Sequence, residues 1–492
     1  MVRSAIKKGY ILVLAAIIFL LCGCKKIPDS IIDLNKAYGN FEEKKNISSD
    51  YRHSENDSLK ISQHDVFYST DHKVRFQMNL DETLCVHDMP VVEVKPHYLT
   101  EEDAKRIAKV LFGNAPCTEK KPILAEEFSK QEIQKKIARW IQYVDSDALY
   151  KLLGEKDTFA QELLKEYIEK FTIKYETAPE NEINIPCQWR FKDEAYYTYS
   201  PTEIAEKNCL LGNNAIMAVY DIGNISYSYK VVTRNRDDYK LNMISAHLFG
   251  GSSPMGIDER IFCSQLCRTN RPTDSQLDAI RDKVEVMLQE MNLGEWYINE
   301  CIVETTLYGD IPEYIVHLNA VPSFYGANAE KQPELYQLNN KTSYASNYYM
   351  TNVTFDFSAE GKLVNFEMIS PVEISNTCSE NVIMYEINDL IKRARVQLMH
   401  SDCHEYGIEK LDDLVKENLI YRVMVNKISL NLLRIRVPNS EDSYYYVPGI
   451  ILEGTEECVG EKSANVYFSS ETPRILVALN AVDGTVIPLV NS

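Results

Sequence analysis

Residues 99–113 read LTEEDAKRIAKVLFG, and they carry the clearest helix start and end in the chain. Thr100 is a suitable N-cap, and the three acidic residues after it favour the positive end of a helix dipole. Gly113 supplies the end, and apolar residues recur at helical spacing at Ala104, Ile107, Ala108 and Leu111. Because alternating strand patterns at 74–80 and 84–94 precede this helix, the stretch predicts an α+β fold.

Sequence patterns of helices and strands continue after this helix. Two longer helices are expected next, with apolar stripes through 133–141 and 149–171. From Ile183 the pattern changes to strands, and residues 221–224 are typical of a turn between two paired strands within 215–232. The Gly/Ser/Pro-rich stretch FGGSSPMG at 249–256 is the best internal break, so the first domain should end near residue 250.

Beyond that break, one helix followed by about four antiparallel strands is predicted twice. The first helix spans 274–291 with a capping-box entry at Thr273, and the second spans about 380–399. The expected strands are 296–308, 312–321, 348–357 and 362–369, and then 421–437, 443–453, 474–482 and 485–490. VHLNAV at 316–321 and VALNAV at 477–482 favour a duplication, although chance remains open because the sequence echoes do not share one register.

These patterns predict tandem domains of antiparallel sheet packed with one or more helices, the two C-terminal ones being possible duplicates. Residues 1–23 form a lipoprotein signal peptide, and 24–65 form a lipidated N-terminus and a flexible polar tether. The three α+β domains are expected at 66–250, 257–372 and 373–492.

The N-terminal segment predicts export and a lipid anchor. Three basic residues precede an apolar run over 11–22, which is shorter than the roughly 20 residues that a transmembrane helix needs. Leu21-Cys22-Gly23-Cys24 resembles the lipobox of bacterial lipoproteins, which implies that Cys24 receives a diacylglycerol and becomes the new N-terminus. The alternative is an ordinary signal peptide in which Cys24 is fortuitous. We expect the lipidated protein to lie on the outer side of the cell membrane.

Charge and cysteine content narrow the range of possible partners and cellular locations. Without residues 1–23 the chain has 50 Lys and Arg against 72 Asp and Glu, a net charge of −22, which excludes a nucleic-acid partner. Ten cysteines remain beyond Cys22 and Cys24, and outside the cytoplasm we expect one or two pairs of them to form disulfides, with connectivity left open. No later segment approaches 18 consecutive apolar residues, so no further membrane span is predicted.

Three features together resemble a known group of proteins. The lipobox, the TEEDA helix start at 100–104 and the closing ILVALNAVDGTVI at 475–487 look like an uncharacterised lipoprotein family of Gram-positive gut anaerobes, a domain of unknown function, over most of the mature chain. The helix-then-hairpin units also look distantly like PepSY-type modules of secreted regulators and protease inhibitors. Relatives of that regulatory class usually have a transmembrane helix, whereas this chain has a lipobox.

Two candidate sites involve cysteine and histidine. His400, Cys403 and His404 form the densest group of metal-type ligands, but zinc needs about four and no second cluster supplies the rest, so no metal residue is assigned. Cys263 and Cys267 are four residues apart, and a disulfide between them would need loop geometry because it is strained across a helical turn.

Two further candidates have equally plain structural explanations. Ser252 and His247 invite a hydrolase interpretation, but the G-x-S-x-G elbow is absent and an interdomain connection explains the same residues. Tyrosine clusters lie at 196–199, 344–349 and 444–446. They are typical either of a surface for sugars or peptides or of half-buried strands.

The sequence therefore favours a lipid-anchored binding or regulatory module of the cell envelope that is not an enzyme. Its expected partners are the membrane, through the lipid, and an envelope protein, peptide or glycan. The alternative is a surface hydrolase acting on peptide or glycan, with a site formed only in the fold. No catalytic or cofactor-binding residue is assigned, no cofactor is expected, and Cys24 is the one functional residue predicted.

Overall fold

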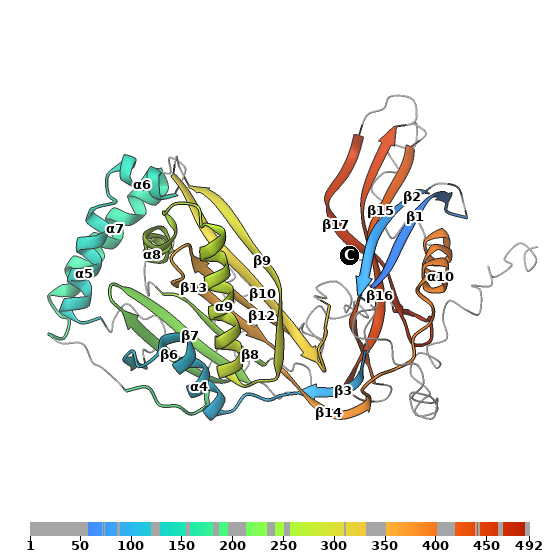
Figure 1. The fold of residues 1–492 in the computed structure, drawn as a ribbon. Helices are drawn as coiled ribbons and strands as arrows, with labels where there is room; N and C mark the ends of the chain where they lie inside the picture. The colour runs from blue at the N-terminus through green and yellow to red at the C-terminus, as the bar shows by residue number, and fades with distance from the viewer. Residues whose placement is uncertain are drawn as a thin grey trace, which may run out of the picture.

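The computed structural model describes residues 58–70, 72, 74–85, 89–119, 128–153, 158–180, 186–194, 213–233, 242–249, 256–308, 311–330, 351–400, 419–437, 440, 443–460 and 466–487. These residues form two lobes, each built on a largely antiparallel sheet with helices packed against it (Figure 1). The α+β class with antiparallel sheets is thus confirmed. None of the helices in these ranges combines the length and the apolar character needed to cross a membrane.

We call the first lobe the terminal lobe, because it contains the first and the last described strands. Its elements are β1 (Ser58–Tyr68), β2 (Val74–Cys85), β3 (Val91–Pro96), β14 (Val372–Ser379), α10 (Ile387–His400), β15 (Leu419–Arg436), β16 (Tyr444–Gly460), β17 (Val466–Asn480) and β18 (Val486–Ile487). The sheet order is β1-β2-β15-β16-β17-β18, and β2 and β15 run parallel. Helix α10 buries Ile387, Leu390 and Ala394 in the same core as Phe76 of β2.

We call the second lobe the central lobe. Its elements are α4 (Glu101–Phe112), β4 (Cys117–Thr118), α5 (Lys130–Ile141), α6 (Ser146–Leu153), α7 (Thr158–Tyr175), β5 (Lys192–Glu194), β6 (Asn213–Ile222), β7 (Ile225–Thr233), β8 (Asn242–Leu248), α8 (Ile257–Cys267), α9 (Asp274–Met291), β9 (Glu295–Tyr308), β10 (Ile311–Phe324), β11 (Ala327–Asn328), β12 (Asn352–Ser358) and β13 (Leu363–Ile369). Helices α4 and α9 lie on one face of its sheet, and α5–α7 form a layer to one side (Figure 1).

The chain enters the central lobe once and leaves it once. Strand β3 leads into α4, and the chain returns through β14, which pairs antiparallel with β3 so that Val372 faces Pro96. The two lobes are joined by this two-stranded connection (Figure 1), and also by Ala329 after β11, which forms an isolated parallel bridge with Leu432 of β15. The described central lobe, residues 99–369, is thus an insertion between the two halves of the terminal lobe.

This path differs from the predicted division at residues 250 and 372. Strands from the predicted 66–250 unit enter both sheets, because β1 and β2 pair in the terminal sheet whereas β6–β8 pair in the central one. Strand β1 also begins at Ser58, inside the stretch predicted to be a tether up to residue 65. Its full-length pairing with β2, which buries Ile61 and Phe67, orders a segment whose own composition is polar.

Helices with local end signals agree with their predictions. Helix α4 begins after Thr100 with a complete capping box to Asp103 and ends at Gly113, whose φ is 63°. Helix α9 spans the predicted 274–291 and has the predicted box from Thr273 to Gln276. The predicted hairpin within 215–232 is confirmed as β6 and β7.

Other helices differ from expectation. The single apolar stripe predicted through 149–171 is divided between α6 and α7, and α8 was not predicted. Helix α10 begins at Ile387 rather than near residue 380, and Ile383, expected on its buried face, is 40% exposed. Helix α8 follows Gly256, which makes no side-chain cap hydrogen bond, so no local signal marks its start.

Candidate ligand-binding cleft at the lobe junction

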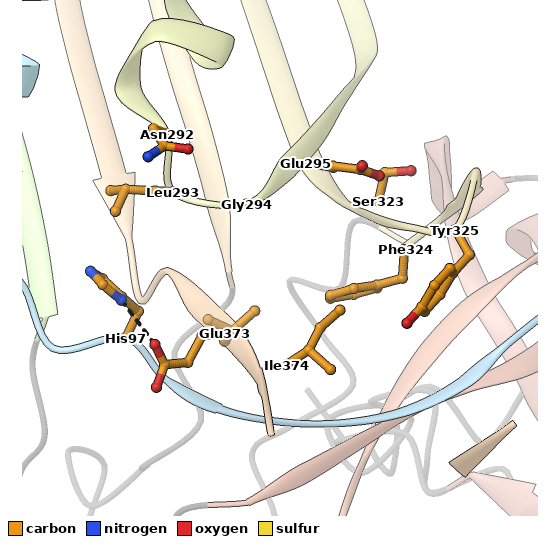
Figure 2. A pocket seen from close by; sticks show the side chains of 11 residues that line it. His97, Asn292, Leu293, Gly294, Glu295, Ser323, Phe324, Tyr325, Glu373 and Ile374 are labelled. Carbon is orange, nitrogen blue, oxygen red and sulfur yellow. Dashed lines mark hydrogen bonds and ion pairs between the residues drawn. The ribbon is translucent and has the colours of Figure 1, made fainter. Parts of the chain in front are cut away.

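A cleft of about 520 Å³ lies where the central lobe meets the β3–β14 connection. Its lining comes from four separate segments: His97, 292–295, 323–325 and 372–374. Figure 2 shows the α9–β9 turn and the end of β10 on one side and β14 on the other, with their side chains around the space between them. The walls are mostly apolar, through Leu293, Phe324, Val372 and Ile374, with polar groups at the margin.

His97 connects the two sides of the junction. Its Nδ1 lies 3.3 Å from Oε2 of Glu373 in β14, and its Nε2 lies 3.1 Å from Oδ2 of Asp103 in α4. Lys95 also contacts Glu373, with its Nζ 3.0 Å from Oε1. The imidazole is thus placed between a carboxylate of the central lobe and one of the connection. Figure 2 shows its contact with Glu373.

The two carboxylates beside His97 are held in the ionised form. Burial opposes ionisation of Asp103, but hydrogen bonds from Thr100, His97 and Arg106 outweigh it and lower its pKa to about 2. The hydrogen bond from Lys95 lowers the pKa of Glu373, burial opposes that shift, and His97 adds to the lowering. Both groups are therefore permanent acceptors at neutral pH.

Asn242 fixes the loop that carries His97. This side chain is 3% exposed, and its Nδ2 donates to the backbone oxygen of His97. Its Oδ1 accepts from the backbone N–H of Leu99 at 3.1 Å, and its own carbonyl accepts from Ser370 at 2.7 Å. At the start of β8, Asn242 therefore contacts both chain crossings, the first through its side-chain amide and the second through its backbone carbonyl.

Tyr325 projects at the cleft margin from a strained turn. Its φ is 51° and that of Gly326 is 82°, the left-handed pair that a tight hairpin turn requires between β10 and β11. A bulky residue in that region costs roughly 1–2 kcal/mol, so asparagine or glycine is usual there. The ring is 50% exposed, and its hydroxyl lies 2.9 Å from Oγ1 of Thr377 in β14. The turn and this hydrogen bond therefore place an aromatic ring at the cleft margin.

The chemistry of the cleft suits a ligand with an apolar or ring-shaped face and hydrogen-bond donors. Tyr325 and Ile374 offer exposed apolar contact, whereas Glu295 and Glu373 offer carboxylate oxygens. Among the described residues, no group of three or more His, Cys, Asp or Glu side chains could hold a metal ion.

A second polar cluster crosses the central sheet. We call it the polar row: His317, Asp356, Asn365, His247 and Ser228, which face one another on successive strands. Nδ1 of His317 lies 2.7 Å from Oδ1 of Asp356, whose Oδ2 accepts from Asn365 at 3.1 Å. The hydrogen bond to Asp356 raises the pKa of His317 although burial opposes it. Half-solvated antiparallel sheets commonly carry such polar faces, so the row has a structural explanation.

Several sequence candidates lie wholly or partly outside the described residues. Cys24, Ser252, Cys403 and His404 are among them, as are the tyrosines at 196–199 and 344–349. His400 ends α10, and His247 belongs to the polar row.

The cysteine pair at 263 and 267 is in a regular helix rather than a loop. Both lie in α8 with their Sγ atoms 3.9 Å apart, and they are not bonded. The structure shows no disulfide among the seven cysteines whose side chains it describes, and the expected one or two disulfides stay a prediction.

The tyrosines at 444–446 do not form an exposed platform. Tyr444 and Tyr446 are 2% and 3% exposed, and Tyr445 is partly buried. The guanidinium of Arg434 lies 3.9 Å from the ring centroid of Tyr444, and the ring of Tyr446 lies 4.8 Å from that of Phe324. These residues contribute to the core and the lobe contact, as half-buried strands require.

The cleft residues were missed by sequence reasoning, because no two of their four segments share a motif. One local signal was available: Tyr325-Gly326 follows a strand pattern and precedes Ala327, an unusual turn with a tyrosine where asparagine is preferred.

Comparison with known proteins adds little. No protein-family model matches the chain, and no curated protein matches it. Among solved structures, it is similar to an uncharacterised protein from Eubacterium rectale at 9% identity and a TM-score of 0.37, over 85% of this chain and 92% of that one. A likeness at this level assigns no function.

Proposed function

We propose that this chain is a lipid-anchored, extracytoplasmic binding protein that holds an envelope peptide or glycan in the junction cleft and does not act as an enzyme. The observation that carries the proposal is the cleft itself, a concave apolar site with a few convergent polar groups. The lipobox ending at Cys24 supports the location. The resemblance to gut-anaerobe lipoproteins and PepSY-type modules agrees with a binding or regulatory role.

The strained turn at Tyr325 supports binding at this place in particular. Backbone strain at a bulky residue is retained where the surrounding structure fixes it, and such positions cluster at ligand sites. Here the hydrogen bond to Thr377 fixes the ring, and Phe324 beside it is anchored against Tyr446. A ring held in advance loses little side-chain entropy when a ligand packs on it.

The anchor is tested by substitution of the two leader cysteines. Cys24→Ala should abolish incorporation of a palmitate analogue and release the protein from the membrane fraction, because no other group then holds the acyl chains. Cys22→Ala is the matched control and should keep the label, because alanine is also small at that lipobox position. A Cys24→Ala protein that still carries the label would contradict the anchor.

The cleft is tested with an array of cell-wall glycan fragments and envelope-protein peptides. Tyr325→Ala should weaken binding of any retained probe about tenfold, because it removes a preformed aromatic contact. Tyr297→Ala is the control: that ring is 43% exposed on β9 and does not line the cleft. Equal loss in both variants, or loss in neither, would place the ligand elsewhere.

The polar row favours a second candidate, the surface hydrolase. His317 paired with Asp356 has the arrangement of a general base, and burial together with the charge of Asp356 raises the pKa of Glu367, as a general acid requires. In the cleft, by contrast, the lowered pKa of Glu373 makes it a poor acid. Turnover of an array probe by the purified protein, lost in His317→Gln, would favour the hydrolase over the binding protein.

We further propose that the C-terminal half contains a duplication. Helix α9 precedes β9, β10, β12 and β13, which pair in that order, and α10 precedes β15–β18, which also pair in order. This shared order supports two copies of one helix-then-four-strand unit. Small hairpin β11 is an addition to the first unit.

A further inference from the structure

Cys117 and Cys187 occupy facing positions at the edge of the central sheet. Thr118 in β4 forms an isolated antiparallel bridge with Pro186. Because antiparallel strands run in opposite directions, the residue before Thr118 faces the residue after Pro186. Those two residues are Cys117 and Cys187.

Both thiols point to the same side of the sheet. Directly facing residues of neighbouring strands share a face, and β4 also pairs Cys117 with Tyr220 of β6. Burial, a hydrogen bond with Cys117 and the nearby thiol of Cys187 together raise the pKa of the Tyr220 hydroxyl, which places both cysteines beside this ring. Both also pack, partly buried, against the hydrophobic core beneath α4.

This geometry meets the requirements of a disulfide. Facing Cα atoms in antiparallel strands lie about 4.5–5.5 Å apart, inside the window of about 4.4–6.8 Å that the bond needs. We infer that Cys117 and Cys187 are joined by a disulfide in the exported protein. The inference rests on the proposed extracytoplasmic location for its oxidising compartment.

The reaction is an exchange with the disulfide of a thiol oxidoreductase. The two S–H bonds break and one S–S bond forms, and the two protons and two electrons pass to the oxidoreductase, whose disulfide becomes two thiols. The segment between the two cysteines contains α5, α6 and α7. The bond would therefore fasten both ends of this helical layer to the edge of the sheet.

Cys263 and Cys267 provide an internal comparison. Their Sγ atoms are 3.9 Å apart, but both lie in α8. Residues four apart on a helix have Cβ atoms about 5–6 Å apart, beyond the roughly 3.5–4.5 Å of a disulfide. Although the two sulfur atoms are close, the helical backbone holds the Cβ atoms too far apart for a disulfide. We therefore expect Cys263 and Cys267 to stay reduced.

The first test uses the full, folded chain. The reduced protein is incubated with oxidised glutathione, alkylated, digested and mapped by mass spectrometry without reduction. A peptide linking Cys117 to Cys187, lighter by two hydrogen atoms than its two parts, is expected, with Cys263 and Cys267 alkylated. Cys117→Ser should remove the linked peptide. Full alkylation of Cys117 and Cys187, or a link from Cys187 to another cysteine, would overturn the inference.

The second test distinguishes a failure of the disulfide inference from a failure of the proposed extracytoplasmic location. The same map is made on protein trapped with the alkylating agent inside cells that carry the complete leader. Detection of the linked Cys117–Cys187 peptide in both tests would support the disulfide and the export of the protein. The link with glutathione but not in cells would contradict the proposed location while confirming the geometry, and its absence from both would overturn the disulfide.

Discussion

Asp258→Ala should unfold the central lobe at much lower urea concentration than the wild type. Asp258 is fully buried in α8, where Oδ2 lies 2.8 Å from Nζ of Lys136 and Oδ1 lies 2.9 Å from Nη1 of Arg139. Oδ1 also accepts from Nε1 of Trp140 at 3.2 Å. Removal of the carboxylate leaves the buried ammonium of Lys136 without its counter-charge, a change that typically costs about 3–5 kcal/mol.

The decrease in the free energy of unfolding follows from the charge state of Lys136. Burial lowers its pKa, and the charge and hydrogen bond of Asp258 oppose that shift. Without Asp258 the lysine must either lose its proton or bury a charge that has lost its hydrogen-bonded carboxylate, and both options destabilise the contact between α5 and α8.

Tryptophan fluorescence reports this lobe selectively, because all three tryptophans, Trp140, Trp189 and Trp296, lie within it. Glu285→Ala is the matched control: it removes an exposed i,i+4 pair with Arg281 and should change stability by less than about 1 kcal/mol. The double variant Lys136→Met/Asp258→Leu should recover part of the loss. Coincident unfolding curves for Asp258→Ala and Glu285→Ala would contradict the assigned role.

Gly454→Ala should destabilise the terminal lobe about as strongly, for a steric reason. A Cβ at Gly454 in β16 would lie 1.9 Å from the backbone oxygen of Met424 in β15 and 2.8 Å from Cδ1 of Leu476. Backbone cannot move aside as a side chain can, so β15 and β16 must separate locally. We expect a loss of about 3 kcal/mol or more.

Hydrogen exchange measures this effect locally. Amides of β15 and β16 should exchange roughly a hundredfold faster in Gly454→Ala than in the wild type. Gly113→Ala is the control, because a Cβ there meets nothing within 4 Å and its strained backbone (φ 63°, ψ −128°) follows α4 in the other lobe, so β15 and β16 should keep their protection. If the amides of β15 and β16 exchanged as slowly as in the wild type, the sheet would be shown to accommodate the methyl group without separating the two strands.

The elements that the sequence predicted well carry their own end signals. Helices α4 and α9 have capping boxes at Thr100 and Thr273, and the β6–β7 hairpin has Gly223 with a φ of 64° at its turn. Each signal acts within one turn of the backbone, so it remains readable without the rest of the fold.

The candidate site was not predictable in the same way. Of the two interpretations of Tyr444–Tyr446, the half-buried strand holds, because β16 lies inside the terminal sheet between β15 and β17. The cleft instead joins Glu373, Tyr325 and His97 from segments with no shared motif. Which strand lies inside a sheet and which loops meet at its end depend on long-range pairing, which a single sequence does not specify.

The sequence by itself determined the acidic charge, the α+β class and the helices with capped ends, because composition and short-range hydrogen bonding decide these features. Only the tertiary structure decided that the central lobe is inserted between two halves of the terminal lobe, that Ser58 begins a strand, and that Cys117 faces Cys187. Strand partners are chosen by burial of whole sheet faces, and segments hundreds of residues apart contribute to that burial together.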